Sequence, residues 1–263
     1  MEASAAERTG QVAQAFVEAR RGGTALPDYP GDLPRTLAEA YDIQDAALAL
    51  ADDGVAGWKV GKIDPPVDGA NRLTGPIFAR AVTTGEVEPV AMPVFADGFA
   101  AAEAEFLLRI AAAPDPAKTS YTMEEAAALI DAVHVGIEVA SSPFPGINAH
   151  GAAVTVSDFG NNNGLVVGAA LDGWPAVDLN AVPVALAING AMVGEATAAT
   201  MLDGPIGAAR FLFELMAARG IALAAGQWIS SGAVTGVHRC AVGDTVIARF
   251  GNGQEVTCRI TKA

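Results

Sequence analysis

The chain contains 263 residues, of which 51% are hydrophobic and 17% charged, so it can bury a sizeable core and wholesale disorder is excluded. Its formal net charge of −14 disfavours nucleic acids and anionic membranes as partners, because both are bound largely through Lys and Arg. The length fits one large domain or a core domain with a smaller appendage, and we expect a cytoplasmic protein.

Residues 1–55 are predicted to form a helical N-terminal region. Apolar residues recur at helical spacing over 5–21, and a stretch rich in Gly and Pro then breaks the pattern. A second helix is predicted over 36–53, where Thr36 and Glu39 have the spacing of a capping box. We expect neither a signal peptide nor a transmembrane helix, because the sequence shows no basic and apolar leader and no apolar run of about 18 residues.

Residues 56–263 are predicted to form a β-rich catalytic domain, which can also be continuous with the helical region. Apolar segments separated by turn residues indicate strands. The predicted strands are 54–62, 85–90, 102–110, 135–142, 163–171, 182–188 and 244–250. Asn189 and Gly190 suit a tight hairpin turn, and residues 251–254 suit another.

Two further helices are predicted within the β-rich region. One spans 121–134 and opens with a capping box formed by Thr122 and Glu125. The other spans 204–220, with a proline in its first turn and a glycine at its end. Strands outnumber helices and do not alternate with them regularly, so we expect an α+β fold built round twisted mixed sheets. No glycine-rich nucleotide-binding motif is present.

Two glutamates interrupt the apolar strand predicted over 102–110. Because side chains alternate along a strand, Glu103 and Glu105 share one face, with their Cα atoms about 6.5–7 Å apart. Carboxylates at that spacing can converge on a hard divalent cation such as Mg²⁺ or Mn²⁺, which prefers oxygen ligands. The alternative is an exposed sheet edge on which water solvates both groups. The pattern alone leaves both interpretations open.

Two more charged residues stand in apolar surroundings. Glu138 is the single charge of its predicted strand, so it faces either a partner inside the protein or the solvent. Lys59 lies between Trp58 and Val60, where partial burial would lower its pKa toward that of a general base. The alternative is a surface lysine whose aliphatic stem covers apolar neighbours.

Taken together, these segments are similar to a known family. The chain resembles the hydratase/decarboxylase branch of the fumarylacetoacetate hydrolase superfamily in the order and spacing of five segments. These are "GWKVGK", "AEAEFLLRI", "IEVASS", "SDFGNNNGLVVG" and "GQWISSGAVTGVHRCAVGDTVIARFG". That branch is typified by 2-keto-4-pentenoate hydratase and includes oxalocrotonate decarboxylase. The resemblance implies a fumarylacetoacetate hydrolase-like fold, in which twisted mixed sheets form a β-rich roll beside a helical N-terminal region.

The same resemblance implies the roles of individual residues. Glu103, Glu105 and Glu138 are expected to hold one Mg²⁺ or Mn²⁺ ion, and Lys59 is expected to act as an acid or base. The substrate-binding residues that it implies are Asn162 and Asn163, with Asn161 as an alternative, and Ser231 and Gly232 in a turn that closes the pocket. A small 2-oxo acid is the implied substrate.

The sequence departs from the family pattern at several positions, among them Leu73, Pro143 and Phe159, and Leu73 bears most directly on the reaction. Leu73 stands where the hydratases carry an acidic residue that exchanges protons with the lysine, and leucine cannot do this. Asp64 is the neighbouring carboxylate that we expect to take its catalytic place. The function implied is a hydratase, a carbon–oxygen lyase that adds water to a 2-hydroxy-2,4-dienoate or related 2-oxo acid in aromatic-compound catabolism. The alternatives are a metal-dependent decarboxylase, C–C hydrolase or tautomerase, or a non-catalytic partner subunit.

The remaining expectations concern association and thiols. The family implies a homo-oligomer and allows a complex with a sister enzyme. Cys240 and Cys258 are expected to be free thiols, as is usual in a reducing compartment. His134, His150 and His238 show no metal-ligand spacing.

Overall fold

The computed structural model describes residues 4–84, 89–251 and 253–263. Its α-helices are α1 (Ala5–Gly22), α2 (Leu37–Leu50), α3 (Met123–Ala128), α4 (Ala152–Ser157) and α5 (Gly204–Arg219). Its strands are β1 (Val55–Val67), β2 (Ala70–Phe78), β3 (Val82–Thr84), β4 (Val90–Val94), β5 (Phe99–Ile110), β6 (Ile130–Ser142), β7 (Asn162–Ala170), β8 (Pro183–Ile188), β9 (Ala191–Thr197), β10 (Trp228–Ser230), β11 (His238–Arg239), β12 (Thr245–Phe250) and β13 (Gln254–Lys262).

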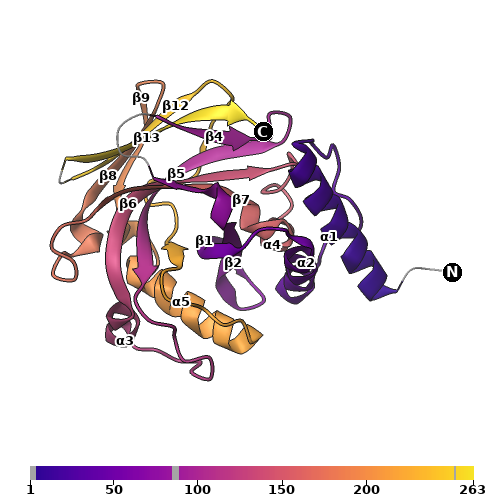
Figure 1. Ribbon diagram of the computed structural model, residues 1–263, viewed down its shortest axis with the longest axis horizontal. Coiled ribbons are helices and arrows are strands. Elements are labelled where there is room, and N and C mark those ends of the chain that lie inside the picture. The colour runs from indigo at the N-terminus through magenta and orange to yellow at the C-terminus, as the bar shows by residue number, and fades with distance from the viewer. Residues whose placement is uncertain (1–3, 85–88, 252) are drawn as a thin grey trace.

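Within the described ranges these strands form two mixed sheets. The larger sheet has the order β2-β1-β10-β5-β6-β7-β3, with β11 also paired to β5, and the smaller has the order β4-β13-β12-β8-β9. Each contains both parallel and antiparallel pairs. In Figure 1 the smaller sheet lies at the top, α1 and α2 lie at the right, and α3 and α5 lie below. The predicted α+β class is confirmed.

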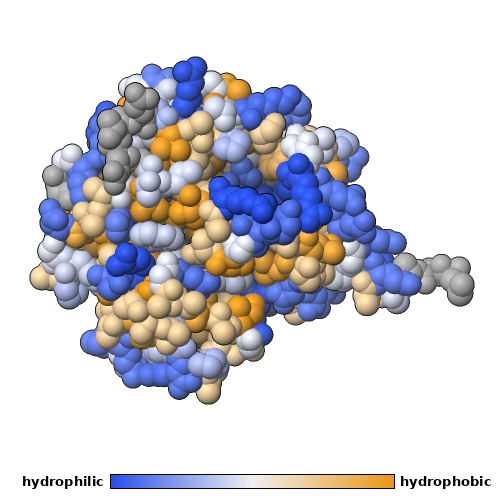
Figure 2. Space-filling view, viewed as in Figure 1, coloured by the Kyte–Doolittle hydropathy of each residue, from blue (hydrophilic) through white to orange (hydrophobic). Residues whose placement is uncertain are grey.

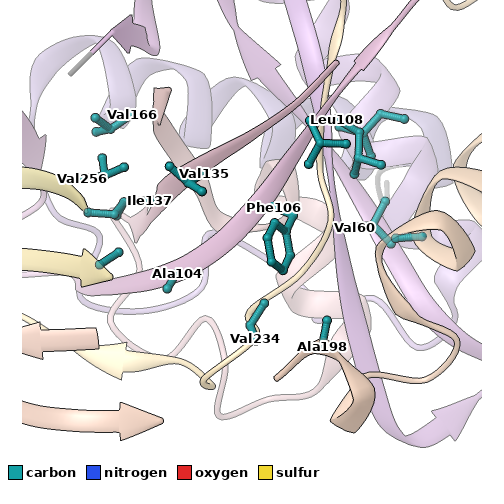
Figure 3. Packing of buried hydrophobic residues seen from close by; sticks show 14 of the residues in the cluster. Val60, Ala104, Phe106, Leu108, Val135, Ile137, Val166, Ala198, Val234 and Val256 are labelled. Carbon is teal, nitrogen blue, oxygen red and sulfur yellow. The ribbon is translucent and has the colours of Figure 1, made fainter. Parts of the chain in front are cut away.

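The largest apolar cluster contains residues from both sheets. Along β5 the alternate residues Ala104, Phe106 and Leu108 face this cluster, where they join Val246 and Val256 of the smaller sheet. Figure 3 shows Phe106 and Leu108 on one strand, with other apolar side chains of the cluster around them. Phe106 is completely buried. The glutamates of β5 alternate with these residues and therefore lie on its opposite face.

Helices α1 and α2 pack beside that opposite face. The Thr36 side chain accepts a hydrogen bond from the Glu39 backbone, as predicted, whereas the Glu39 carboxylate accepts from Arg35 instead of completing the box. Apolar residues of α1 join a cluster with residues of β5, β6 and the following loop. Arg20 then fixes α1 to the connection between α4 and β7 through an ion pair with Asp158, at 2.6 Å between Nε and Oδ1.

Most predicted elements are confirmed, but the helix over 121–134 is wrong in its second half. The capping box of Thr122 and Glu125 forms, yet α3 ends at Ala128 and β6 begins at Ile130. Long-range pairing with β5 overrides the helical pattern, because Ile130 already lies in register with Ile110.

The predicted turns and the final helix are also found. Asn189 and Gly190 both have positive φ angles, as a tight hairpin turn requires, and they join β8 to β9. Helix α5 ends at a left-handed glycine, Gly220. Of the predicted strand over 85–90, residues 85–88 lie outside the described residues, as does Asn252 of the last turn. The strand predicted over 54–62 continues to Val67, and it pairs with β2, a strand that was not predicted.

The face shown in Figure 2 is mixed in polarity, and both cysteines are reduced. Within the described ranges, no helix is both long and apolar enough to cross a membrane. Figure 2 shows hydrophilic and hydrophobic residues interspersed over the visible face. Cys240 and Cys258 are both free thiols, as expected, and Cys258 is buried.

Candidate active site

Strands β5 and β6 bring the three predicted carboxylates together. Glu103 lies directly opposite Glu138 in the antiparallel register, and Glu105 lies two residues further along the same face of β5. One carboxylate oxygen from each residue lies within 4.8 Å of the other two. All three side chains are buried, and Glu105 and Glu138 have no exposed surface. The structure therefore excludes the solvated sheet edge that the sequence left open.

Neighbouring groups fix the orientation of two of these carboxylates. Oε2 of Glu105 accepts hydrogen bonds from the Ser230 hydroxyl and from the Gly232 backbone N–H, the latter at 2.9 Å. Oε1 of Glu138 accepts one from the Asn162 amide at 2.8 Å. Supporting donors of this kind hold metal-ligating carboxylates in one orientation.

The second carboxylate oxygens of Glu105 and Glu138 accept no hydrogen bond from the described residues and are free to bind a cation. Oε1 of Glu105 is buried without a hydrogen-bond partner in the part of the chain that is described. Oε2 of Glu138 makes no hydrogen bond of good geometry and faces the Lys59 ammonium at 3.1 Å. Buried carboxylate oxygens without donors are costly unless a cation satisfies them, so the cluster fits a divalent cation.

Lys59 projects from β1 toward the carboxylates. It is 5% exposed, and its ammonium donates a hydrogen bond of 3.1 Å to Oδ1 of Asn161. Burial alone lowers the pKa of Lys59, but the charges of Glu138, Glu103 and Glu105 outweigh burial and raise that pKa above its ordinary value. The expectation of a lowered pKa is therefore wrong, because the sequence did not show that three carboxylates surround the ammonium.

Burial and mutual repulsion raise the pKa values of Glu103 and Glu105. Burial, with a further contribution from Glu138, raises the pKa of Glu103 to about 7 despite the opposing charge of Lys59. Burial and the charges of Glu138 and Glu103 raise the pKa of Glu105 well above its ordinary value. The protein alone thus supplies too little positive charge for these carboxylates.

A cavity of about 380 Å³ opens beside Lys59 and Glu103. Leu73 is 5% exposed and lies at its wall, close to Gly61 and to the aliphatic stem of Lys59. Asp64 lines the same cavity, but its carboxylate is 69% exposed and pairs with Lys62 at 2.7 Å. The structure therefore places the carboxylate of Asp64 beside Lys62, with no ion pair to Lys59.

The residues expected to bind substrate divide into two groups. Asn162 and Gly232 contact the carboxylate cluster, and Ser231 is buried next to them with a hydroxyl that has no partner among the described residues. Asn163 points elsewhere, because its side chain bonds to Arg20 and donates to the backbone oxygen of Pro93.

Sequence reasoning missed two residues of the cavity wall, Asn148 and Thr155. Ser230 belongs to the turn expected to close the pocket, and its hydroxyl orients Glu105. The contact of Asn148 with Asn161 depends on how the intervening loop and α4 fold, so no local pattern marks it. The one available signal was the loop around Asn148, which follows directly after the strand that carries Glu138.

No family model and no curated protein matches the chain. Solved structures do match it. 4-Oxalocrotonate decarboxylase from Pseudomonas putida G7, complexed with magnesium and adipate, has a TM-score of 0.81 at 22% identity and covers 97% of both chains. Fumarylpyruvate hydrolase from Pseudomonas aeruginosa, in complex with Mn²⁺ and pyruvate, has a TM-score of 0.61 at 12% identity, covering 81% of this chain and 93% of that chain.

A third match is 5-carboxymethyl-2-hydroxymuconate delta-isomerase from Mycobacterium smegmatis, with a TM-score of 0.57 at 18% identity, covering 80% of this chain and 81% of that chain. These likenesses define the class of fold: the chain has a fumarylacetoacetate hydrolase-like fold, and that prediction is confirmed. More particularly, it shares the fold of 4-oxalocrotonate decarboxylase over nearly its whole length. The three matched enzymes catalyse different reactions, so the fold does not define the reaction.

Proposed function

We propose that the chain is a metal-dependent enzyme of the hydratase/decarboxylase branch of the fumarylacetoacetate hydrolase superfamily. The observation that carries this proposal is the buried cluster of Glu103, Glu105 and Glu138, whose oxygens lie within 4.8 Å of one another while Lys59 is the single cation in contact with them among the described residues. Solved structures of the same fold hold magnesium, calcium or Mn²⁺. We assign the three glutamates as ligands of one Mg²⁺ or Mn²⁺ ion.

The substrate class follows from the charges around the cluster. A bound divalent cation would act as a Lewis acid that polarises the carbonyl of a 2-oxo acid. The Lys59 ammonium attracts the negative charge that develops on substrate oxygens and carries a proton that it can donate. The matched decarboxylase was solved with acetate or adipate and the matched hydrolase with pyruvate, and all three ligands are carboxylates.

The reaction that the cavity supports best is the decarboxylation of a 2-oxo acid. Leu73 presents an apolar wall beside Lys59, where a hydratase would need a carboxylate to exchange protons and activate water. Decarboxylation needs no activated water. The bond between the conjugated chain and the carboxylate distal to the oxo group would break, and CO₂ would leave. The electron pair of that bond would move through the conjugated carbons to the oxo oxygen, and the ammonium of Lys59 could then protonate the resulting dienolate.

Hydration of a 2-hydroxy-2,4-dienoate is the second candidate. The observation that favours it is Asp64, whose carboxylate lies at the rim of the same cavity and is open to solvent. Release from Lys62 would leave this carboxylate able to accept a proton from water.

One pair of incubations tests the function. Protein and Mg²⁺ are mixed with 2-oxohex-3-enedioate or with 2-hydroxypenta-2,4-dienoate, and the products are identified by NMR. We expect CO₂ release from the first substrate, abolished by EDTA and by Glu105→Gln. Conversion of the second substrate to a 4-hydroxy-2-oxo acid, without decarboxylation of the first, would instead support the hydratase. Equal conversion with EDTA and with Mg²⁺ would rule out both metal-dependent candidates.

A further inference from the structure

A chain of polar side chains leads from Lys59 into the cavity, and its orientation is fixed at one end. The Lys59 ammonium can only donate hydrogen bonds, so Asn161 must present its Oδ1 toward it. The NH₂ group of Asn161 is then directed to the other side, where it donates to Oδ1 of Asn148 at 3.0 Å. The hydrogen-bond network therefore assigns both amide groups without ambiguity.

The backbone around Asn161 keeps this chain in place. Phe159, Gly160 and Asn161 have φ angles of 54°, 62° and 57°, so three successive residues are left-handed. Asn is among the side chains that tolerate this conformation best. The turn lies directly on Gly75, which pairs with Lys59 across β1 and β2, because a Cβ atom on Gly75 would lie 2.0 Å from the Phe159 carbonyl oxygen.

Asn148 is left with one unused donor. Its Oδ1 accepts from Asn161 at 3.0 Å. The Thr155 hydroxyl lies 3.2 Å from the same oxygen and can donate its one proton either there or to the backbone oxygen of Ile147 or Gly151. Its NH₂ group has no acceptor among the described residues. Asn148 is exposed and lines the same cavity as Lys59 and Glu103.

The other residues at this end of the cavity offer little competition for a substrate oxygen. Leu73, Val67 and Ala152 are apolar. Lys62 is engaged by Asp64, so the pair carries no net charge. A polar group at the far end of a substrate therefore meets the NH₂ group of Asn148 as an uncommitted donor whose orientation is already fixed, which lowers the entropic cost of binding.

We propose that Asn148 is a specificity-determining residue that donates a hydrogen bond to an oxygen at the far end of the substrate, where the oxo diacid of the proposed function carries its second carboxylate. The inference rests on the proposed function, since a metal at the three glutamates would hold the oxo-acid end. Lys59 acts on the tail only indirectly, by fixing Asn161 and through it Asn148.

Binding of two saturated acids to the Mg²⁺-loaded protein tests this role without turnover. 2-Oxoadipate and 2-oxohexanoate have the same chain length and differ in the terminal carboxylate alone. We expect calorimetry to show that wild type binds 2-oxoadipate about tenfold or more tightly, the usual effect of a hydrogen bond to a charged group. Asn148→Ala should remove this preference. Asn148→Asp keeps the acceptor oxygen that Asn161 needs but replaces the donor by a second oxygen, so it should reverse the preference.

Lys62→Met combined with Asp64→Asn is the matched control, because it removes the rim ion pair without leaving an unpaired charge and keeps Asn148 intact. It should retain most of the preference for 2-oxoadipate. Equal binding of the two acids by wild type, or an unchanged preference in both Asn148 variants, would overturn this inference alone. If neither acid binds in a Mg²⁺-dependent way, both the proposed function and the inference fail.

Discussion

Replacing Glu105 with glutamine should change the stability of the metal-free protein and its affinity for metal in opposite directions. Glutamine keeps a carbonyl oxygen that can accept from Ser230 and Gly232, so the local hydrogen bonds are retained. It removes one negative charge from a group of three buried carboxylates. Without metal that charge is a source of repulsion, whereas with metal it is a ligand.

The size of the effect follows from the geometry. Two unit charges 4.8 Å apart interact by about 3.5 kcal/mol at an effective dielectric constant of about 20. Glu105 has two negative neighbours and one positive neighbour, so loss of its charge relieves a net repulsion of about 3 kcal/mol. Protonation already relieves part of this, since the pKa of Glu105 is raised. We therefore expect Glu105→Gln to stabilise the metal-free protein by about 1–3 kcal/mol near pH 8.

Urea unfolding in EDTA and in saturating Mg²⁺ measures both effects. Loss of a ligand should weaken Mg²⁺ binding by at least about 100-fold, which removes about 2.7 kcal/mol of metal-induced stabilisation. Asp158→Asn is the matched control, because Asp158 is a buried carboxylate paired with its own arginine. It should destabilise the protein equally in both buffers. A Glu105→Gln protein that is less stable in EDTA and binds Mg²⁺ as tightly as wild type would refute the reasoning.

Two further predictions concern the same cluster. Lys59→Met leaves the carboxylates without their cation, so the metal-free protein should lose about 3–5 kcal/mol of unfolding free energy. In Mg²⁺ the same variant should lose turnover, while calorimetry shows that Mg²⁺ binding is retained. Unchanged stability in EDTA would contradict this. Burial raises the pKa of Glu103 from 4.5 to about 7, so its contribution to the stability of the metal-free protein is complete below 4.5 and is lost as the pH rises through 7. Mg²⁺ competes with this proton, so its affinity should rise over the same pH range, and a flat profile from titrations would count against a protonated Glu103.

Much of this fold could be predicted from local patterns. The alternation in β5 placed Glu103 and Glu105 on one face, and capping residues marked the start of α3 correctly. Periodicity failed where a partner strand decides the conformation. Residues 130–134 have the composition of a helix, but they lie in register with β5 and become part of β6.

The environment of the site could not be predicted in the same way. Whether Glu138 faces Glu103 depends on the register between two strands, which no single segment specifies. The pKa of Lys59 was expected to fall with burial, and it rises because the lysine meets three carboxylates. Asn148 acquires its orientation from Asn161, which belongs to a turn of three left-handed residues that no local pattern predicts.

The three carboxylates all belong to one antiparallel strand pair, and this has a consequence for folding. If β6 slipped by one residue against β5, Glu138 would move to the opposite face and meet the apolar layer around Phe106. Such an arrangement would bury an isolated charge and would scatter the carboxylates. The charged cluster therefore disfavours slips of one residue between these two strands, because only alignments that keep Glu138 on the face of Glu103 and Glu105 allow a cation to compensate the buried charge.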